Sequence, residues 1–147
     1  MRDSGRLGAA IEILDDFERR RVPLKIALAD WARSARYAGA RDRAFVSGLC
    51  LDVLRRRRSL AAAMDDDSPR AAALAGLRWL WGYALDTVSA LAAEAPHGPG
   101  PLTASETEKL AGATLLPAGA PAPVAGDFPE WLEPHVARAF GGGAGGA

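Results

Sequence analysis

Apolar residues recur at helical intervals in several stretches of the chain, and the first of these stretches lies near the N-terminus. Its apolar positions follow one another three or four residues apart: Leu7, Ile11, Leu14 and Phe17. This spacing predicts an amphipathic helix over residues 4–20, with Ser4 as its N-cap because a serine hydroxyl accepts a hydrogen bond from the first turn. Pro23 favours the first position of a second helix. The apolar face of that second helix is expected to contain Leu24, Ala27, Leu28 and Trp31.

The longest apolar stripe lies in the stretch Gly39–Leu60, where we expect a long helix that faces the core, and residues 60–64 are expected to add a short further helix. The buried positions of the long helix are expected to be Phe45, Val46, Leu49, Val53 and Leu54. Gly48 stands in its middle and costs about 0.5–1 kcal/mol relative to alanine, so we expect another helix to approach closely there. Arginines flank the helix at both ends, with Arg41 and Arg43 before the stripe and Arg55–Arg58 after it.

Capping signals mark further helices in the second half of the chain. Ser68 followed by Pro69 combines an N-cap residue with proline at the first helical position, which predicts a helix that runs to about residue 84. This segment is unusually apolar and is expected to be the central buried helix. Asp86 is expected to cap a short helix after it. The sequence TASE at 103–106 fits a capping box and predicts another short helix.

These patterns predict an all-α protein with no internal repeat. We expect a helical bundle over residues 1–94, followed by a Pro/Gly-rich linker over residues 95–127. A separate C-terminal helix is predicted over residues 128–141, and the glycine-rich residues 142–147 are expected to form a flexible tail. The apolar face of the separate helix needs a surface, which is either the bundle or a part of the protein beyond Ala147.

The composition bounds the environment of the protein. The chain has 147 residues, nearly half of them hydrophobic, so it can build one domain core. Cys50 is the only cysteine, which excludes an intrachain disulfide and favours a reducing compartment. Neither a signal peptide nor a membrane span is evident in the sequence. We therefore expect a soluble, cytoplasmic protein with no membrane partner.

No constellation of residues typical of catalysis or metal binding is present. The chain has no glycine-rich phosphate loop between a strand and a helix and no paired Cys/His spacing. His97 and His135 are isolated and are interpreted as surface residues, and Cys50 as a buried thiol within the core. No cofactor or metal is expected in this chain, and we expect no enzymatic activity from it.

The arginines are the candidate functional residues. Residues 1–70 carry 15 basic and 11 acidic residues, whereas residues 71–147 carry 3 basic and 7 acidic ones. One reading is that some arginines contact RNA phosphates; the other is that they stabilise a helix C-terminus or pair with Asp52 at helical spacing. Trp79, Trp81 and Tyr83 are a further candidate, as a base-stacking platform, but core packing is the favoured reading. The candidate RNA-binding residues are Arg2, Arg6, Arg41, Arg43, Arg55, Arg56, Arg57 and Arg58.

Two stretches resemble a known helical family. The segment ARDRAFVSGLCLDVLRRRRSL resembles the NusB-like domain, in which an Asp-Arg pair opens a long helix that ends in Leu-Arg-Arg. The matching residues are Asp42, Arg43, Phe45, Val46, Leu54, Arg55 and Arg56. The resemblance implies that Asp42 is the helix cap. The following SPRAAALAGLRWLWG resembles the next long helix of the family, with Leu77 and Arg78 before a glycine and aromatic residues.

The C-terminal sequence FPEWLEPHVARAFG narrows the resemblance. It is similar to the helix that leads into the catalytic part of RsmB-type methyltransferases, which act on cytosine C5 of 16S ribosomal RNA. The resemblance implies an RNA-binding accessory domain whose partners are ribosomal RNA and its own downstream methyltransferase domain. S-adenosylmethionine is expected only in that missing domain. The alternatives are a stand-alone NusB-like antitermination factor that binds RNA and a purely structural helical interaction domain.

Overall fold

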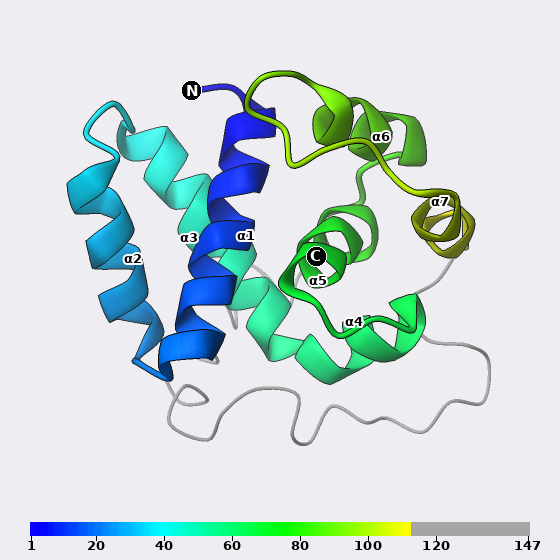
Figure 1. The fold of residues 1–147 in the computed structure, drawn as a ribbon, viewed down its shortest axis with the longest axis horizontal. Coiled ribbons are helices and arrows are strands. Elements are labelled where there is room, and N and C mark those ends of the chain that lie inside the picture. The colour runs from blue at the N-terminus through cyan, green and yellow to red at the C-terminus, as the bar shows by residue number, and fades with distance from the viewer. Residues whose placement is uncertain (113–147) are drawn as a thin grey trace.

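Seven α-helices and one π-helical segment follow one another through residues 1–112, the part of the chain that the computed structural model describes (Figure 1). Their bounds are α1 (Asp3–Arg20), α2 (Leu24–Ser34), α3 (Ala40–Arg55), α4 (Arg57–Met64), α5 (Pro69–Ala75), η1 (Gly76–Leu80), α6 (Leu85–Ala93) and α7 (Ala104–Leu110). Residues 1–112 contain no strand, which confirms the predicted all-helical class for this part. The helix predicted over 128–141, the tail over 142–147 and His135 lie outside the described residues.

Two of the predicted capping signals start helices. The Ser68 hydroxyl accepts a hydrogen bond from the Ala71 amide at 3.1 Å, and Pro69 takes the first position of α5. At α7, the Thr103 hydroxyl accepts from the Glu106 amide at 3.1 Å. The Glu106 carboxylate in turn accepts from the Thr103 amide at 2.8 Å. Both motifs satisfy amide groups that the first helical turn leaves without a partner.

Two other predicted caps are wrong. Helix α1 begins at Asp3, directly after Arg2, so Ser4 lies inside its first turn. The buried Ser4 hydroxyl donates a hydrogen bond to the Glu94 carboxylate at 2.8 Å, which ties α1 to the end of α6. Helix α6 begins at Leu85 without a side-chain cap, and Asp86 lies in its first turn. In both places the helix begins one residue before the residue predicted to cap it.

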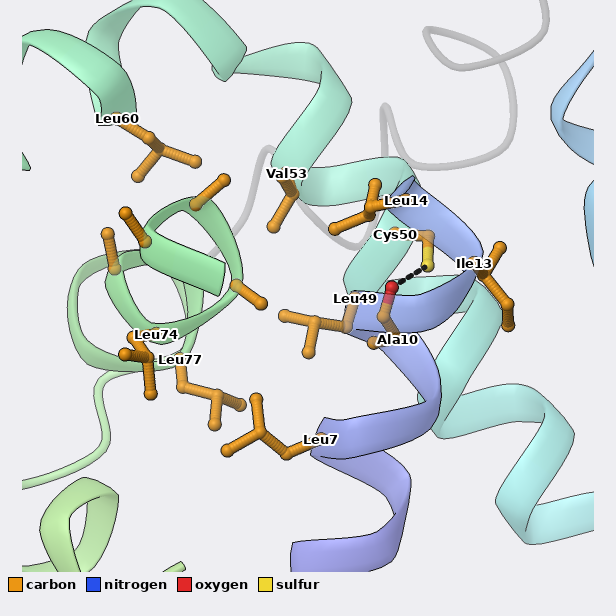
Figure 2. Packing of buried hydrophobic residues seen from close by; sticks show 14 of the residues in the cluster. Leu7, Ala10, Ile13, Leu14, Leu49, Cys50, Val53, Leu60, Leu74 and Leu77 are labelled. Atoms are coloured by element: carbon orange, nitrogen blue, oxygen red, sulfur yellow. Dashed lines mark hydrogen bonds between the residues drawn. The ribbon is translucent and has the colours of Figure 1, made fainter. Parts of the chain in front are cut away.

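The core lies where α1, α3 and α5 meet. Figure 2 shows apolar side chains from these helices, from α4 and from η1 pointing toward one another. The run Ala71–Leu77 is buried at every position, which confirms that the helix starting at Pro69 is central. Its last turn is π-helical and ends at Leu80 rather than at residue 84. Within residues 1–112, no helix has both the length and the apolar character needed to cross a bilayer.

The long helix expected in the stretch Gly39–Leu60 ends at Arg55, and the chain changes direction at Arg56, so the short further helix begins at Arg57 rather than at residue 60. Arg56 has φ −126° and ψ 24°, outside the helical region, and α4 begins immediately after it. The change of direction lets α4 pack on α5, where Leu60 and Met64 are buried. Contacts between helices therefore override the helical pattern of the sequence at this point.

Helix α7 packs on the bundle although its residues belong to the segment predicted as a linker. It contacts α4 and α6, and Leu110 is completely buried. Arg70 of α5 fixes the segment that leads to α7. Its guanidinium donates to the Glu106 carboxylate at 2.8 and 3.0 Å and to the carbonyl oxygens of Pro99, Gly100 and Pro101 at 2.9 to 3.0 Å. The packed structure consequently extends beyond residue 94.

The close approach expected at Gly48 occurs at another glycine. A Cβ atom on Gly48 would lie 3.6 Å from Cζ2 of Trp81, which is an ordinary contact. A Cβ atom on Gly76, by contrast, would lie 2.7 Å from Cγ2 of Val53. The absence of a side chain at Gly76 is therefore what allows η1 to lie close against α3.

Candidate nucleic-acid interface

Arg6 is part of the internal structure of the bundle. Its Nε donates to Oδ1 of Asp42 at 2.7 Å, and its Nη1 donates to Oδ1 of Asp3 at 2.9 Å. The guanidinium also lies 5.5 Å from the ring centroid of Phe45, within range of a cation–π contact. Arg6 thus joins α1 to the start of α3 and has its hydrogen-bonding capacity directed inward.

Asp42 holds the N-terminus of α3. Gly39 occupies the N-cap position, and its amide donates to Oδ2 of Asp42, three residues later, at 2.8 Å. This backbone hydrogen bond, together with the one from Arg6, lowers the pKa of the Asp42 carboxyl below its ordinary value. The side chain therefore supports the helix start from the third helical position, whereas the cap position predicted for Asp42 belongs to Gly39.

Arg57 and Arg2 also have partners in the bundle. The Arg57 guanidinium binds the Glu18 carboxylate through two hydrogen bonds of 2.7 and 3.1 Å, and it also donates to the carbonyl oxygen of Asp67. Arg57 therefore joins α4 to α1 and to the loop before α5. Arg2 makes a looser ion pair with Glu94 at 3.5 Å, and its side chain remains 80% exposed.

The four consecutive arginines do not form one surface. The change of direction at Arg56 separates Arg55, at the end of α3, from Arg57 and Arg58 in α4. Arg58 is exposed, whereas Arg55 and Arg56 are half-buried. Asp52 accepts a hydrogen bond from Nε1 of Trp81 at 2.8 Å.

Arg41 and Arg43 lie exposed in the first turn of α3. Two neighbours in the preceding loop, Arg36 and Tyr37, are also exposed, and Tyr37 leaves 73% of its surface uncovered. Within residues 1–112, the structure records no ion pair or hydrogen bond for the side chains of these three arginines. The positive end of the α3 dipole adds to their charge. We call these four residues the α2–α3 corner.

The sequence analysis names Arg41 and Arg43 as candidates but does not include Arg36 and Tyr37, which the structure leaves exposed beside them. The sequence feature that points to them is the pair Arg36-Tyr37, an arginine beside an aromatic residue just before a helix that begins with two further arginines. The structure brings these four residues to the same end of α3.

A cleft of about 730 Å³ adjoins the α2–α3 corner. Tyr37 and Trp31 contribute aromatic surface to the cleft, and two glycines of α1, Gly5 and Gly8, contribute surface without side chains. The opposite wall is the segment 96–99. A Cβ atom at Gly8 would lie 3.0 Å from the carbonyl oxygen of His97, so this segment passes directly over α1.

Trp81, Trp79 and Cys50, the other residues considered in the sequence, make contacts within the bundle. Trp81 packs edge-on against Phe45 with ring centroids 4.9 Å apart, and Trp79 donates to the carbonyl oxygen of Gly112 at 3.0 Å. Cys50 is fully buried with its Sγ 3.7 Å from the carbonyl oxygen of Ala10 (Figure 2), and burial raises the pKa of its thiol. The predicted buried thiol is confirmed.

Among residues 1–112, no three His, Cys, Asp or Glu side chains are arranged to hold a metal ion.

Comparison of the chain with protein-family models, with curated proteins and with solved structures finds no match. The resemblance to the NusB-like domain and to RsmB-type methyltransferases stays a prediction that rests on the residues that carry it. The α2–α3 corner does not depend on that resemblance. It is defined by the exposure of its four residues and by the lack of recorded ion pairs for its three arginines within residues 1–112.

Proposed function

We propose that this chain is an RNA-binding helical domain that engages ribosomal RNA through the α2–α3 corner. The observation that carries the proposal is that Arg36, Arg41 and Arg43 are exposed, without recorded ion pairs in the described residues, within a few residues of the exposed Tyr37 at the start of α3. Arginines attract and orient phosphates, while an exposed aromatic ring offers a surface on which an unpaired base stacks. Proteins commonly combine these two contacts to bind single-stranded RNA.

The ion pairs of the bundle make Arg6 and Arg57 weaker candidates. Arg6 and Arg57 would have to give up short hydrogen bonds to Asp42 and Glu18 before they could reach a phosphate. Removing one partner from such a pair leaves the other carboxylate poorly compensated, which costs free energy. The proposal therefore keeps Arg41 and Arg43 from the predicted set and adds the two residues of the preceding turn.

The wider context of the proposal comes from the sequence resemblance. It supports a NusB-like bundle that serves as the accessory domain of an rRNA cytosine-C5 methyltransferase. The catalytic domain and its S-adenosylmethionine would then lie outside residues 1–147. A coding sequence that continues past Ala147 into a methyltransferase would exclude the alternative of an independent antitermination factor.

The test measures binding of fluorescently labelled single-stranded fragments of 16S ribosomal RNA to the full chain at several salt concentrations. We expect the double variant Arg41→Gln/Arg43→Gln to weaken binding. Its log–log salt slope should fall in magnitude by about 1.4, because each lost phosphate contact on a single strand contributes about 0.7.

The matched control is Arg19→Gln/Arg20→Gln. Both control residues are exposed, lie in the last turn of α1 and pair with Asp16, so this variant makes the same change in net charge away from the α2–α3 corner. Equal loss of affinity in both double variants would indicate a general charge effect. RNA binding that neither variant changes, or no RNA binding at all, would favour a structural interaction domain.

A further inference from the structure

The cleft beside the α2–α3 corner contains groups that the proposed phosphate contacts do not use. Tyr37 belongs to both features, since it flanks Arg36 in the sequence and also lines the cleft. An RNA strand that crosses the corner would therefore pass the mouth of the cleft. The volume of about 730 Å³ lies within the range of about 300–1,000 Å³ found for small-ligand pockets. One nucleobase can enter such a space.

We propose that this cleft binds one unpaired guanine of the RNA, an inference that rests on the proposed function. Glu12 and Arg2 both line the cleft. The Glu12 carboxylate has no recorded hydrogen bond or ion pair within residues 1–112, and the long Arg2–Glu94 pair leaves the Arg2 guanidinium largely exposed. The cleft therefore offers an acceptor group and a donor group in addition to its aromatic surface.

Guanine is the base whose edges complement these two groups. Its N1–H and N2–H2 groups are adjacent donors that match the two oxygens of the Glu12 carboxylate. Its O6 and N7 atoms are the acceptors that arginine recognises most often. Uracil presents one N–H between two carbonyl oxygens and would place an oxygen against Glu12. Adenine and cytosine each present an amino group beside a ring nitrogen that accepts, so they match the carboxylate through one contact.

Hydrogen bonds within the bundle fix the wall of the cleft formed by residues 96–99. The Gly98 amide donates to the carbonyl oxygen of Glu94 at 2.7 Å, and Arg70 holds the carbonyl oxygen of Pro99 at 2.9 Å. The wall therefore needs no ordering when a base enters, which lowers the entropic cost of binding. Trp31 and Tyr37 supply the apolar surface against which a purine ring packs.

The test compares hexauridylate with hexamers in which one central uridine is replaced by guanosine, inosine or adenosine, each titrated against the full chain. We expect the guanosine hexamer to bind about tenfold more tightly than hexauridylate, in line with the effect of one well-placed bidentate contact. Inosine, which lacks the N2 amino group, should bind with intermediate affinity. Glu12→Gln should reduce the guanosine-to-uridine ratio to within about twofold.

The control for Glu12→Gln is Asp15→Asn, which removes the same charge from an exposed position on the same helix. It should leave the guanosine-to-uridine ratio unchanged. Equal affinity for all hexamers, with binding that still depends on Arg41 and Arg43, would overturn the guanine site and leave the proposed function intact. A preference for adenosine would also overturn it. Absence of any RNA binding would overturn both proposals.

Discussion

Replacement of Gly76 by alanine tests whether close contact between η1 and α3 limits stability. Gly76 has φ −60° and ψ −46°, so alanine can adopt its backbone conformation, and helix propensity alone would favour alanine by about 1 kcal/mol. The added Cβ would, however, lie 2.7 Å from Cγ2 of Val53 and 3.4 Å from Cδ1 of Leu49. Both of these side chains are completely buried.

Overpacking of this kind typically costs about 1–3 kcal/mol, because neighbouring side chains or backbones must move. We therefore expect Gly76→Ala to lower the free energy of unfolding by up to about 2 kcal/mol despite the gain in helix propensity. Gly48→Ala is the matched control. Its Cβ would meet only Trp81 at 3.6 Å, and we expect it to raise the free energy of unfolding by about 0.5–1 kcal/mol.

Urea unfolding, followed by tryptophan fluorescence and by circular dichroism, measures both free energies. The double variant Gly76→Ala/Val53→Ala adds a further check, since removal of the Val53 methyl groups relieves the contact. The destabilisation of the double variant should be smaller than the sum of the two single effects. If Gly76→Ala stabilises the protein as much as Gly48→Ala does, the contact with Val53 does not constrain the fold.

Two further predictions concern the ion pairs. Arg70→Leu should lower the free energy of unfolding by about 2–3 kcal/mol, because it leaves the buried Glu106 carboxylate without its partner; a loss under about 1 kcal/mol in urea unfolding would contradict this role. Asp42→Asn should destabilise the protein most at neutral pH. The pKa of Asp42 is lowered in the folded state, first by the Gly39 amide and then by Arg6, so its contribution is present above the ordinary aspartate pKa and disappears as the pH falls through the lowered value. Thermal unfolding of both proteins between pH 7 and pH 2.5 checks this, and a difference in melting temperature that stays constant across that range would refute it.

The sequence predicts helix starts well when the signal is contained in a few neighbouring residues. Ser68 and Thr103 cap their helices through contacts three residues away, so local pattern is sufficient. The change of direction at Arg56 has no such signal, because the run Arg55–Arg58 contains no glycine, proline or capping residue that would mark the exact position. It depends on the packing of α4 against α5, and the pairing of residues far apart in the sequence is not visible in helical periodicity.

The candidate site shows the same limit. The sequence does not distinguish the eight predicted arginines from one another. In the structure, however, Arg6 and Arg57 bind carboxylates 36 and 39 residues away in the sequence. Which arginines remain available is decided by these tertiary contacts. Charge patterning therefore located Arg41 and Arg43, while only the folded chain shows that Arg36 and Tyr37 lie with them and that a cleft adjoins them.

The run Arg55–Arg58 has a further consequence for how the chain tolerates insertions and deletions. Arg58 is exposed, so the identity of the side chain there matters little to the core. The number of residues in the run is a different matter, because each residue advances a helix by about 100°. Loss of one arginine would rotate Leu60 and Met64 away from α5, even though three arginines remained. We expect the run to accept substitutions at Arg58 and to reject changes in the number of residues.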